Sequence, residues 1–187
     1  ALAVRKHIAV AKLFGADSFG LFPGRLAGLW INHFVRGGLA LLSAYFQAGI
    51  GFSGVNIDIA TFLFKFLRGL GMPFIIGADA NCSAADLRSS GWLEAIGADV
   101  VEPPGITCRQ GAGSTIDFII VDKRIAGRRG PCWTHDRGAT WPHLIAAVTV
   151  PLNLREALHW TPKQPKQFPR EVVSGPLRSH DHWTVAR

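Results

Sequence analysis

The chain of 187 residues is long enough for one domain with a hydrophobic core, and 48% of its residues are hydrophobic, which excludes global disorder. Three cysteines, an odd number, do not make the framework of a disulfide-rich secreted domain. We therefore expect an intracellular, reducing environment, and the nucleus is one compartment that fits this expectation.

The net charge of +7 is distributed unevenly along the sequence. Residues 1–36 carry five basic and one acidic side chain, residues 37–150 carry nine of each, and residues 151–187 carry six basic and three acidic. Basic segments beside a neutral block can bind a polyanion such as nucleic acid, although ordinary soluble tails have the same composition. We divide the chain into a weakly patterned N-terminal segment (1–36), a central domain (37–150) and a Pro-rich tail (151–187).

The N-terminal third contains a predicted helix, a loop and a strand. Residues 4–14 are compatible with a helix that has a basic face, and the glycines and proline of residues 15–28 indicate a loop. Residues 38–46 form a short apolar run that predicts a buried strand ending near Tyr45. The uncharged run between Arg36 and Asp58 is long enough to raise the question of a membrane span. Its five glycines and several polar residues favour a strand and a loop instead.

The next segment predicts a strand–helix–strand unit. From residue 59 to residue 70, apolar side chains recur at steps of three and four, which predicts an amphipathic helix capped by Asn56 or Asp58. Residues 73–78 then read as a second buried strand. This order is typical of a crossover between two parallel strands.

The remaining elements are shorter. Ser83 and Asp86 resemble a capping box, which predicts a short helix from residue 84, and residues 92–96 predict a further helical turn. Residues 106–109 and 115–121 have the composition of two strands joined as a hairpin, and residues 144–150 predict the last strand of the domain.

Polar side chains lie at the ends of these strands. Asp79 and Asn81 follow the strand at 73–78, and they share one side of it if the strand continues that far. A carboxylate beside a carboxamide suits the activation of water next to a phosphate, and a polar turn is the alternative interpretation.

An aspartate inside an apolar strand needs a partner, and Asp117 lies in such a strand. His143, just before the last strand, is a candidate, because an Asp–His pair orients the imidazole and can hold it charged beside a phosphate. A carboxylate facing solvent on a half-exposed strand is the alternative interpretation of Asp117.

The order of these residues resembles that in the endonuclease/exonuclease/phosphatase (DNase I-like) family. The resemblance covers residues 38–150, which correspond to the C-terminal part of the family domain, and the motif style is most similar to retroelement endonucleases. It implies an α/β fold, the four-layer α/β sandwich of the DNase I-like type, incomplete at its N-terminus. The motifs that carry it are Leu42-Ser-Ala-Tyr45, Ala78-Asp-Ala-Asn81, Ser114-Thr-Ile-Asp-Phe118 and Trp141-Pro-His143.

The resemblance implies Mg²⁺-dependent hydrolysis of phosphodiesters in nucleic acid, with DNA favoured over RNA and no membrane partner. Asp79 would orient or deprotonate the attacking water, and Asn81 would hold water or phosphate. His143, oriented by Asp117, would stabilise the developing charge of the phosphate, and Tyr45 would hydrogen-bond a phosphate oxygen.

Two carboxylates that the family pattern places at the metal are missing from this sequence. The family has a glutamate on a strand before the tyrosine strand, whereas the first glutamate here is Glu94, and Pro142 stands where an aspartate precedes the histidine. The metal ligands are therefore not identified, and we expect either a fragment of a longer reading frame or a relative without full chemistry. The alternative function is a catalytically inactive remnant that binds nucleic acid or protein.

A basic cluster follows the aspartate strand. Its side chains are candidates for contact with a phosphate backbone, and a solvated loop is the simpler interpretation. The four residues are Lys123, Arg124, Arg128 and Arg129.

Overall fold

The computed structural model describes residues 2, 4–6, 8–13, 22–32, 37–136 and 141–151. Its centre is a six-stranded mixed sheet in the order β1-β2-β3-β4-β6-β5. A second sheet pairs β7 with β8. The strands are β1 Val10–Lys12, β2 Leu26–Ile31, β3 Leu39–Tyr45, β4 Phe74–Asp79, β5 Ala98–Val101, β6 Asp117–Asp122, β7 Cys132–His135 and β8 Ile145–Val148.

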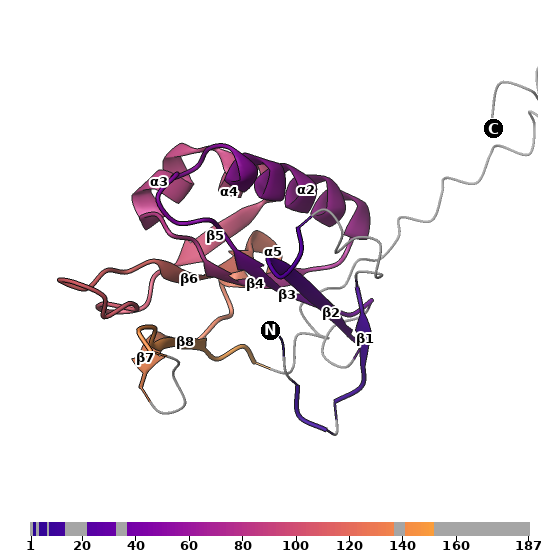
Figure 1. Ribbon diagram of the computed structural model, residues 1–187. Coiled ribbons are helices and arrows are strands. Elements are labelled where there is room, and N and C mark those ends of the chain that lie inside the picture. The colour runs from indigo at the N-terminus through magenta and orange to yellow at the C-terminus, as the bar shows by residue number, and fades with distance from the viewer. Residues whose placement is uncertain are drawn as a thin grey trace, which may run out of the picture.

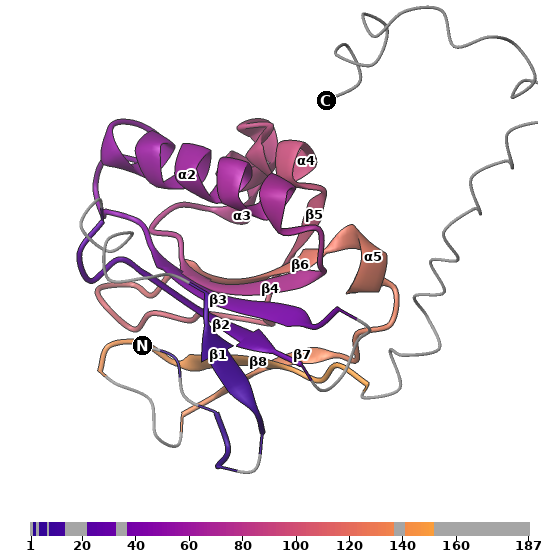
Figure 2. The same ribbon diagram turned by 90° about the vertical axis from the view of Figure 1, so that its right-hand side faces the viewer.

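Three of the four predicted layers lie within the described residues (Figures 1 and 2). Three helices cover one face of the six-stranded sheet, and the β7–β8 sheet packs against the other face, while a fourth short helix follows directly after β6. The predicted α/β sandwich is therefore confirmed in these layers. The helices are α2 Val55–Leu70, α3 Ala84–Ser89, α4 Trp92–Ile96 and α5 Lys123–Ala126.

Side chains along the strands alternate between the two faces of the sheet, so the hydrophobic core is divided into two clusters. Leu42, Ile76 and Ile120 are buried in the cluster that packs against the helices. The neighbouring residues point the opposite way, since successive side chains of a strand alternate between faces. Ile75 and Ile119 accordingly belong to the cluster on the face that carries β7 and β8. Residues of β4 and β6 at odd numbers therefore face the second sheet.

The predicted crossover is confirmed, because β3 and β4 are parallel and α2 connects them. The predicted cap is wrong: α2 begins after Gly54, whose φ of 51° suits glycine, and no side chain caps it. Asn56 is buried in the first turn instead. Its side chain accepts a hydrogen bond from the Gln47 amide at 2.6 Å and donates to the carbonyls of Gln47 and Gly51. This residue thereby holds the loop that follows β3.

The N-terminal segment differs from its prediction. Residues 10–12 form strand β1 rather than part of a helix, and β2, residues 26–31, begins within the stretch 15–28 that was predicted as a loop. Both strands join the same sheet, since β1 pairs with β2 and β2 pairs with β3. The sheet thus extends N-terminal of residue 37, where the sequence pattern suggested a boundary. Residues 152–187, which hold nearly all of the predicted tail, lie outside the described part of the chain.

The predicted hairpin between residues 106–109 and 115–121 is also wrong. Strand β6 pairs with β4 and β5 instead, and β5 was not predicted. Only Cys108 of the expected first strand makes bridges, one to Ser114 and one to His143. The capping box at Ser83 is confirmed, as are β3, β4 and β8 to within a few residues. Within the described ranges no helix is both long and apolar enough to cross a membrane.

Candidate active site

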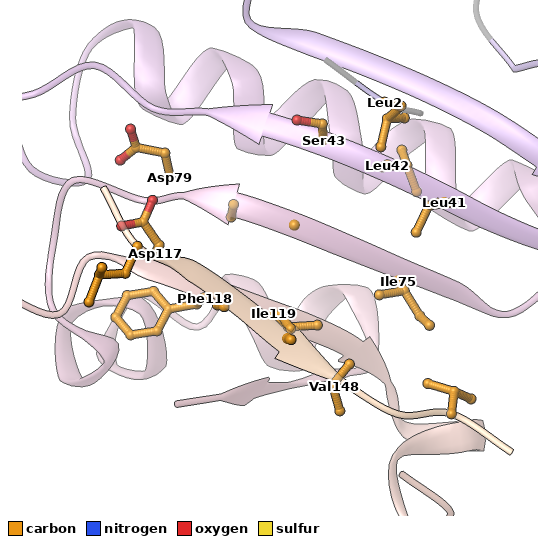
Figure 3. Close-up of a pocket in the computed structure, with 16 residues that line it drawn as sticks. Leu2, Leu41, Leu42, Ser43, Ile75, Asp79, Asp117, Phe118, Ile119 and Val148 are labelled. Atoms are coloured by element: carbon orange, nitrogen blue, oxygen red, sulfur yellow. The ribbon is translucent and has the colours of Figure 1, made fainter. Parts of the chain in front are cut away.

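One row of residues crosses the sheet at the end of β3 and β4. Tyr45 is the register partner of Asp79, and Asp79 is the partner of Asp117. Residues opposite one another on neighbouring strands point to the same face of a sheet. All three side chains therefore lie on the face that carries β7 and β8. Figure 3 shows the carboxylates of Asp79 and Asp117 side by side at the end of these strands.

His143 completes the cluster from the segment before β8. Its Nδ1 donates to both oxygens of Asp117, at 3.0 Å and 3.2 Å, and its Nε2 lies 4.0 Å from Oδ2 of Asp79. The side chains of the three residues are between 18% and 35% exposed, so the cluster is open to solvent at one side. The structure therefore brings together three of the five residues predicted to be catalytic.

The surroundings of Asp79 raise the pKa of its carboxyl group. The pKa of its carboxyl is raised to about 6, first by burial and then by the charge of Asp117, while His143 and the Asn81 backbone N–H act in the opposite direction. One of its oxygens, Oδ1, is buried without a hydrogen-bond partner among the described residues. A carboxylate in this state can accept a proton from water or bind a cation.

Thr107 aligns the two halves of the cluster, a role that no sequence motif predicted. It is fully buried, its Oγ1 accepts hydrogen bonds from the amides of Ile116 and Asp117, and its carbonyl accepts from the amide of Leu144. One residue thus fixes the backbone of Asp117 and the residue after His143. Thr107 follows two prolines within four residues and precedes a cysteine, and no local sequence pattern distinguishes it from an ordinary core residue.

Replacing Thr107 by valine should lower the free energy of unfolding by about 1–3 kcal/mol, because two partly buried amides lose their acceptor while the side-chain volume is kept. Urea denaturation at pH 7 measures this change. Thr115→Val is the matched control, since its hydroxyl donates to a single exposed carbonyl, that of Gly105. Equal stabilities for Thr107→Val and the wild type would contradict the role of Thr107.

The hydrogen bond from His143 to Asp117 raises the pKa of the imidazole, and the charges of Asp117 and Asp79 act in the same direction. Asp117→Asn should therefore lower the pKa of His143, measured by NMR titration of the imidazole protons without metal. Because the folded-state pKa is raised, the pair stabilises the fold at pH values below the unfolded pKa of about 6.5. That contribution disappears as the pH rises through the folded pKa. An unchanged pKa in Asp117→Asn would contradict the pairing.

Asn81 and Tyr45 are placed differently from the cluster. Strand β4 ends at Asp79, and Asn81 has a left-handed φ of 50°, so the alternation of a strand does not reach it. Its Nδ2 donates to the carbonyl of Phe46 at 2.8 Å, which ties together the ends of β3 and β4. Tyr45 is 42% exposed, and the guanidinium of Arg25 lies over its ring, 5.1 Å from the centroid. Arg25 was not predicted as a site residue.

The predicted basic cluster lies at the other end of β6. Lys123 and Arg124 follow Asp122, whereas the site begins at Asp117. Lys123 pairs with Glu94, and Arg124 binds both oxygens of the buried Asp122 and the carbonyls of Gly71 and Met72. These two side chains are engaged in structural contacts. Contact of the cluster with nucleic acid stays a prediction.

A pocket of about 590 Å³ lies between the two sheets, with Asp79 and Asp117 at one end (Figure 3). Its walls are mostly aliphatic and include Leu41, Ile75 and Val148. Gly77 belongs to the same wall, and a Cβ there would meet no atom within 4 Å. The carboxylates are therefore partly desolvated by an apolar surface, which agrees with the raised pKa of Asp79.

The chemistry of the cluster fits a divalent cation. Asp79, Asp117 and His143 offer two carboxylate oxygens and an imidazole nitrogen within 4.8 Å of one another. The unpartnered Oδ1 of Asp79 adds a free acceptor at the same place. Oxygen ligands suit Mg²⁺, and a mixed oxygen and nitrogen set also suits Mn²⁺.

Several solved structures share this arrangement of elements. The endonuclease domain of TRAS1, a telomere-specific non-LTR retrotransposon, has a TM-score of 0.62 and 16% identity over 79% of this chain and 69% of its own. Cytolethal distending toxin from Actinobacillus actinomycetemcomitans gives 0.53 and 14%, over 75% of this chain and 58% of the toxin chain. The 3' phosphatase NExo from Neisseria, bound to a product DNA hairpin, gives 0.50 and 14%, over 76% and 70%.

This chain has the DNase I-like fold. At identities of 14% to 16% the likeness concerns the fold, and the chain spans between 56% and 71% of the first neighbours' lengths. No family model and no curated protein sequence matches the chain. The DNase I-like architecture predicted from four short motifs is confirmed by structures of nucleases and phosphatases.

Proposed function

We propose that this DNase I-like chain is a metal-dependent phosphodiester hydrolase domain that acts on nucleic acid, with weak activity in its present form. The observation that carries the proposal is the cluster of Asp79, Asp117 and His143 at the end of the central strands. Nucleases and a DNA-bound phosphatase with the same fold support the substrate class. DNA is the proposed substrate.

Each residue of the site has a separate proposed role in the hydrolysis. Asp79, with its raised pKa and free oxygen, orients the attacking water and accepts its proton. His143 is held by Asp117 with its Nε2 toward Asp79, so a charged imidazole faces the place where a phosphate oxygen gains negative charge. Tyr45, one strand away and partly exposed, donates to another phosphate oxygen. Asn81 supports the site by fixing the end of β4 to β3.

A divalent cation is part of the proposal, with Asp79 and Asp117 as its protein ligands. When bound it supplies positive charge that stabilises the phosphate in the transition state. Mg²⁺ is the expected ion, because the ligand atoms in question are carboxylate oxygens.

The test is cleavage of an end-labelled DNA duplex by excess protein over a long incubation, with Mg²⁺ or with EDTA. We expect slow cleavage that requires the metal and disappears in Asp79→Ala and in His143→Ala. Cleavage that persists in both variants would come from a contaminating nuclease and would contradict the proposal.

The alternative function is a non-catalytic module that binds nucleic acid or protein. The substitution of Pro142 beside His143 favours it, because proline offers no carboxylate to the site. Metal-independent, salt-sensitive retention of DNA, with no cleavage at any protein concentration, would support this alternative.

A further inference from the structure

A tryptophan side chain is exposed beside the cluster of Asp79, Asp117 and His143. Trp141 is 75% exposed, whereas the other exposed large hydrophobic side chains of the described residues are between 40% and 47% exposed. A tryptophan packed in its own fold buries about 150–250 Å² of surface, so this indole gives up most of that stabilisation. An exposed ring two residues before His143 is placed to stack against a bound molecule.

The backbone that follows Trp141 is held against a neighbouring segment. The amide of Arg109 donates to the carbonyl of Pro142 at 2.9 Å, and the amide of Leu144 donates to the carbonyl of Thr107 at 2.6 Å. Two residues span at most about 7 Å, so the Cα of Trp141 is no farther than that from the Cα of the cluster histidine. The indole is therefore anchored by fixed backbone next to the imidazole.

Arg109 brings an unpaired positive charge to the same segment. Its side chain is exposed, and within the described ranges its guanidinium makes no hydrogen bond or ion pair. It lines a hollow of about 370 Å³ together with Leu144, the residue after His143. The carboxylate in this hollow, that of Asp136, lies 3.6 Å from Nδ1 of His135. A guanidinium without a partner suits a phosphate, to which it donates paired hydrogen bonds.

We propose that Trp141 and Arg109 form a nucleotide subsite next to the cluster, where the indole stacks on an unpaired base and the guanidinium binds a phosphate of the same strand. The subsite rests on the proposed function, since it takes the strand whose phosphodiester is cleaved. Stacking on an aromatic ring tolerates all four bases, because every base has a π face. A base inside a duplex is already stacked on both sides, so the subsite selects strands with unpaired bases.

The test compares two single strands of equal length and charge in EDTA, hexathymidylate and a strand of six abasic nucleotides. The fluorescence anisotropy of an end label measures the affinity of the full chain for each. Hexathymidylate should bind about tenfold more tightly, which is within the range that one base stacked on an aromatic side chain contributes. Trp141→Ala should remove this difference, and Trp141→Phe, which keeps an aromatic ring, should retain most of it.

Trp133→Ala is the matched control, because Trp133 is 40% exposed on β7, and it should leave the difference between the two strands unchanged. Equal affinities for the two strands in the wild type, or the same difference in Trp141→Ala as in the wild type, would overturn the stacking role. Trp141→Ala should not alter the affinity for a closed circular duplex, measured by competition. Equal weakening for the duplex and the single strand would overturn the selection of unpaired bases.

Arg109→Gln tests the phosphate contact separately. It should weaken both strands alike, because they have the same backbone. The slope of log affinity against log salt should fall in magnitude by about 0.7, the value for one phosphate contact to a single strand. An unchanged slope in Arg109→Gln would overturn the phosphate contact.

Binding and cleavage together separate the subsite from the proposed hydrolysis. A chain that prefers hexathymidylate through Trp141 in EDTA, but cleaves no DNA with Mg²⁺, keeps the subsite and loses the enzyme. A chain that cleaves single-stranded DNA with the same KM and kcat in Trp141→Ala as in the wild type keeps the enzyme and loses the subsite. The expected result for Trp141→Ala is a KM raised about tenfold, with kcat little changed.

Discussion

Plasmid nicking by this chain, at saturating Mg²⁺ or Mn²⁺, should be at least about a thousandfold slower than nicking by the endonuclease domain of TRAS1 in a parallel assay. The described cluster supplies Asp79 and Asp117 as its only carboxylates, and Pro142 precedes His143 where the family pattern has an aspartate. A hard cation held by few oxygen ligands is poorly fixed. Metal-ion catalysis contributes several kcal/mol, so weakening it slows turnover by roughly three orders of magnitude.

Asp79→Ala is the control that shows whether any nicking belongs to this site. Robust nicking that disappears in this variant would contradict the prediction of weak activity. It would also mean that a further acidic residue serves as a metal ligand; Asp136, which flanks a small pocket with His135 and Arg109, would be the first to replace.

Removal of the Asp79 carboxylate should abolish detectable Mn²⁺ binding by the folded chain, measured by titration calorimetry at pH 7.5. Among the described residues, Asp79 offers the one buried carboxylate oxygen that lacks a hydrogen-bond partner, and its carboxylate offers a ligand atom within 4.8 Å of those of Asp117 and His143. Its loss leaves one carboxylate and an imidazole that is already bonded to that carboxylate. Asp99→Ala is the matched control, because Asp99 is exposed on β5 and has the same charge.

The affinity for Mn²⁺ should also depend on pH in a defined direction. A pKa of about 6 means that Asp79 is mostly protonated at pH 5 and mostly ionised at pH 7. Protons compete with the metal for the carboxylate, so affinity should rise roughly tenfold between these two pH values. The raised pKa of His143 acts in the same direction, because the charged imidazole repels the cation. Affinity that does not change with pH, or an Asp79→Ala variant that binds as the wild type does, would argue against this metal site.

The local sequence pattern was sufficient to predict the elements that contain one strongly apolar run of residues. The strands ending at Tyr45 and Asp79, the amphipathic helix between them and the capping box at Ser83 were all predicted from neighbouring residues. Strands β1, β2, β5 and β7 were missed. β1, β5 and β7 have only three or four residues each, and β2 begins within the glycine-containing stretch 15–28 that predicted a loop. The hairpin expected between residues 106–109 and 115–121 failed because β6 pairs with β4 and β5 instead. Cys108 keeps one local bridge, to Ser114, and makes a second to His143, 35 positions later.

The sequence by itself determined the order of the site residues and the strands that carry them, since Asp79, Asp117 and His143 stand at strand ends whose hydrophobic pattern is local. Only the tertiary structure decided which of these side chains meet. The antiparallel register sets Asp79 against Asp117, a turn with positive φ takes Asn81 to the carbonyl of Phe46, and Thr107 brings the last segment alongside. Arg25, directly before β2, comes beside Tyr45 because β2 pairs with β3. Register and long-range hydrogen bonds join residues distant in the chain, so no local pattern encodes them.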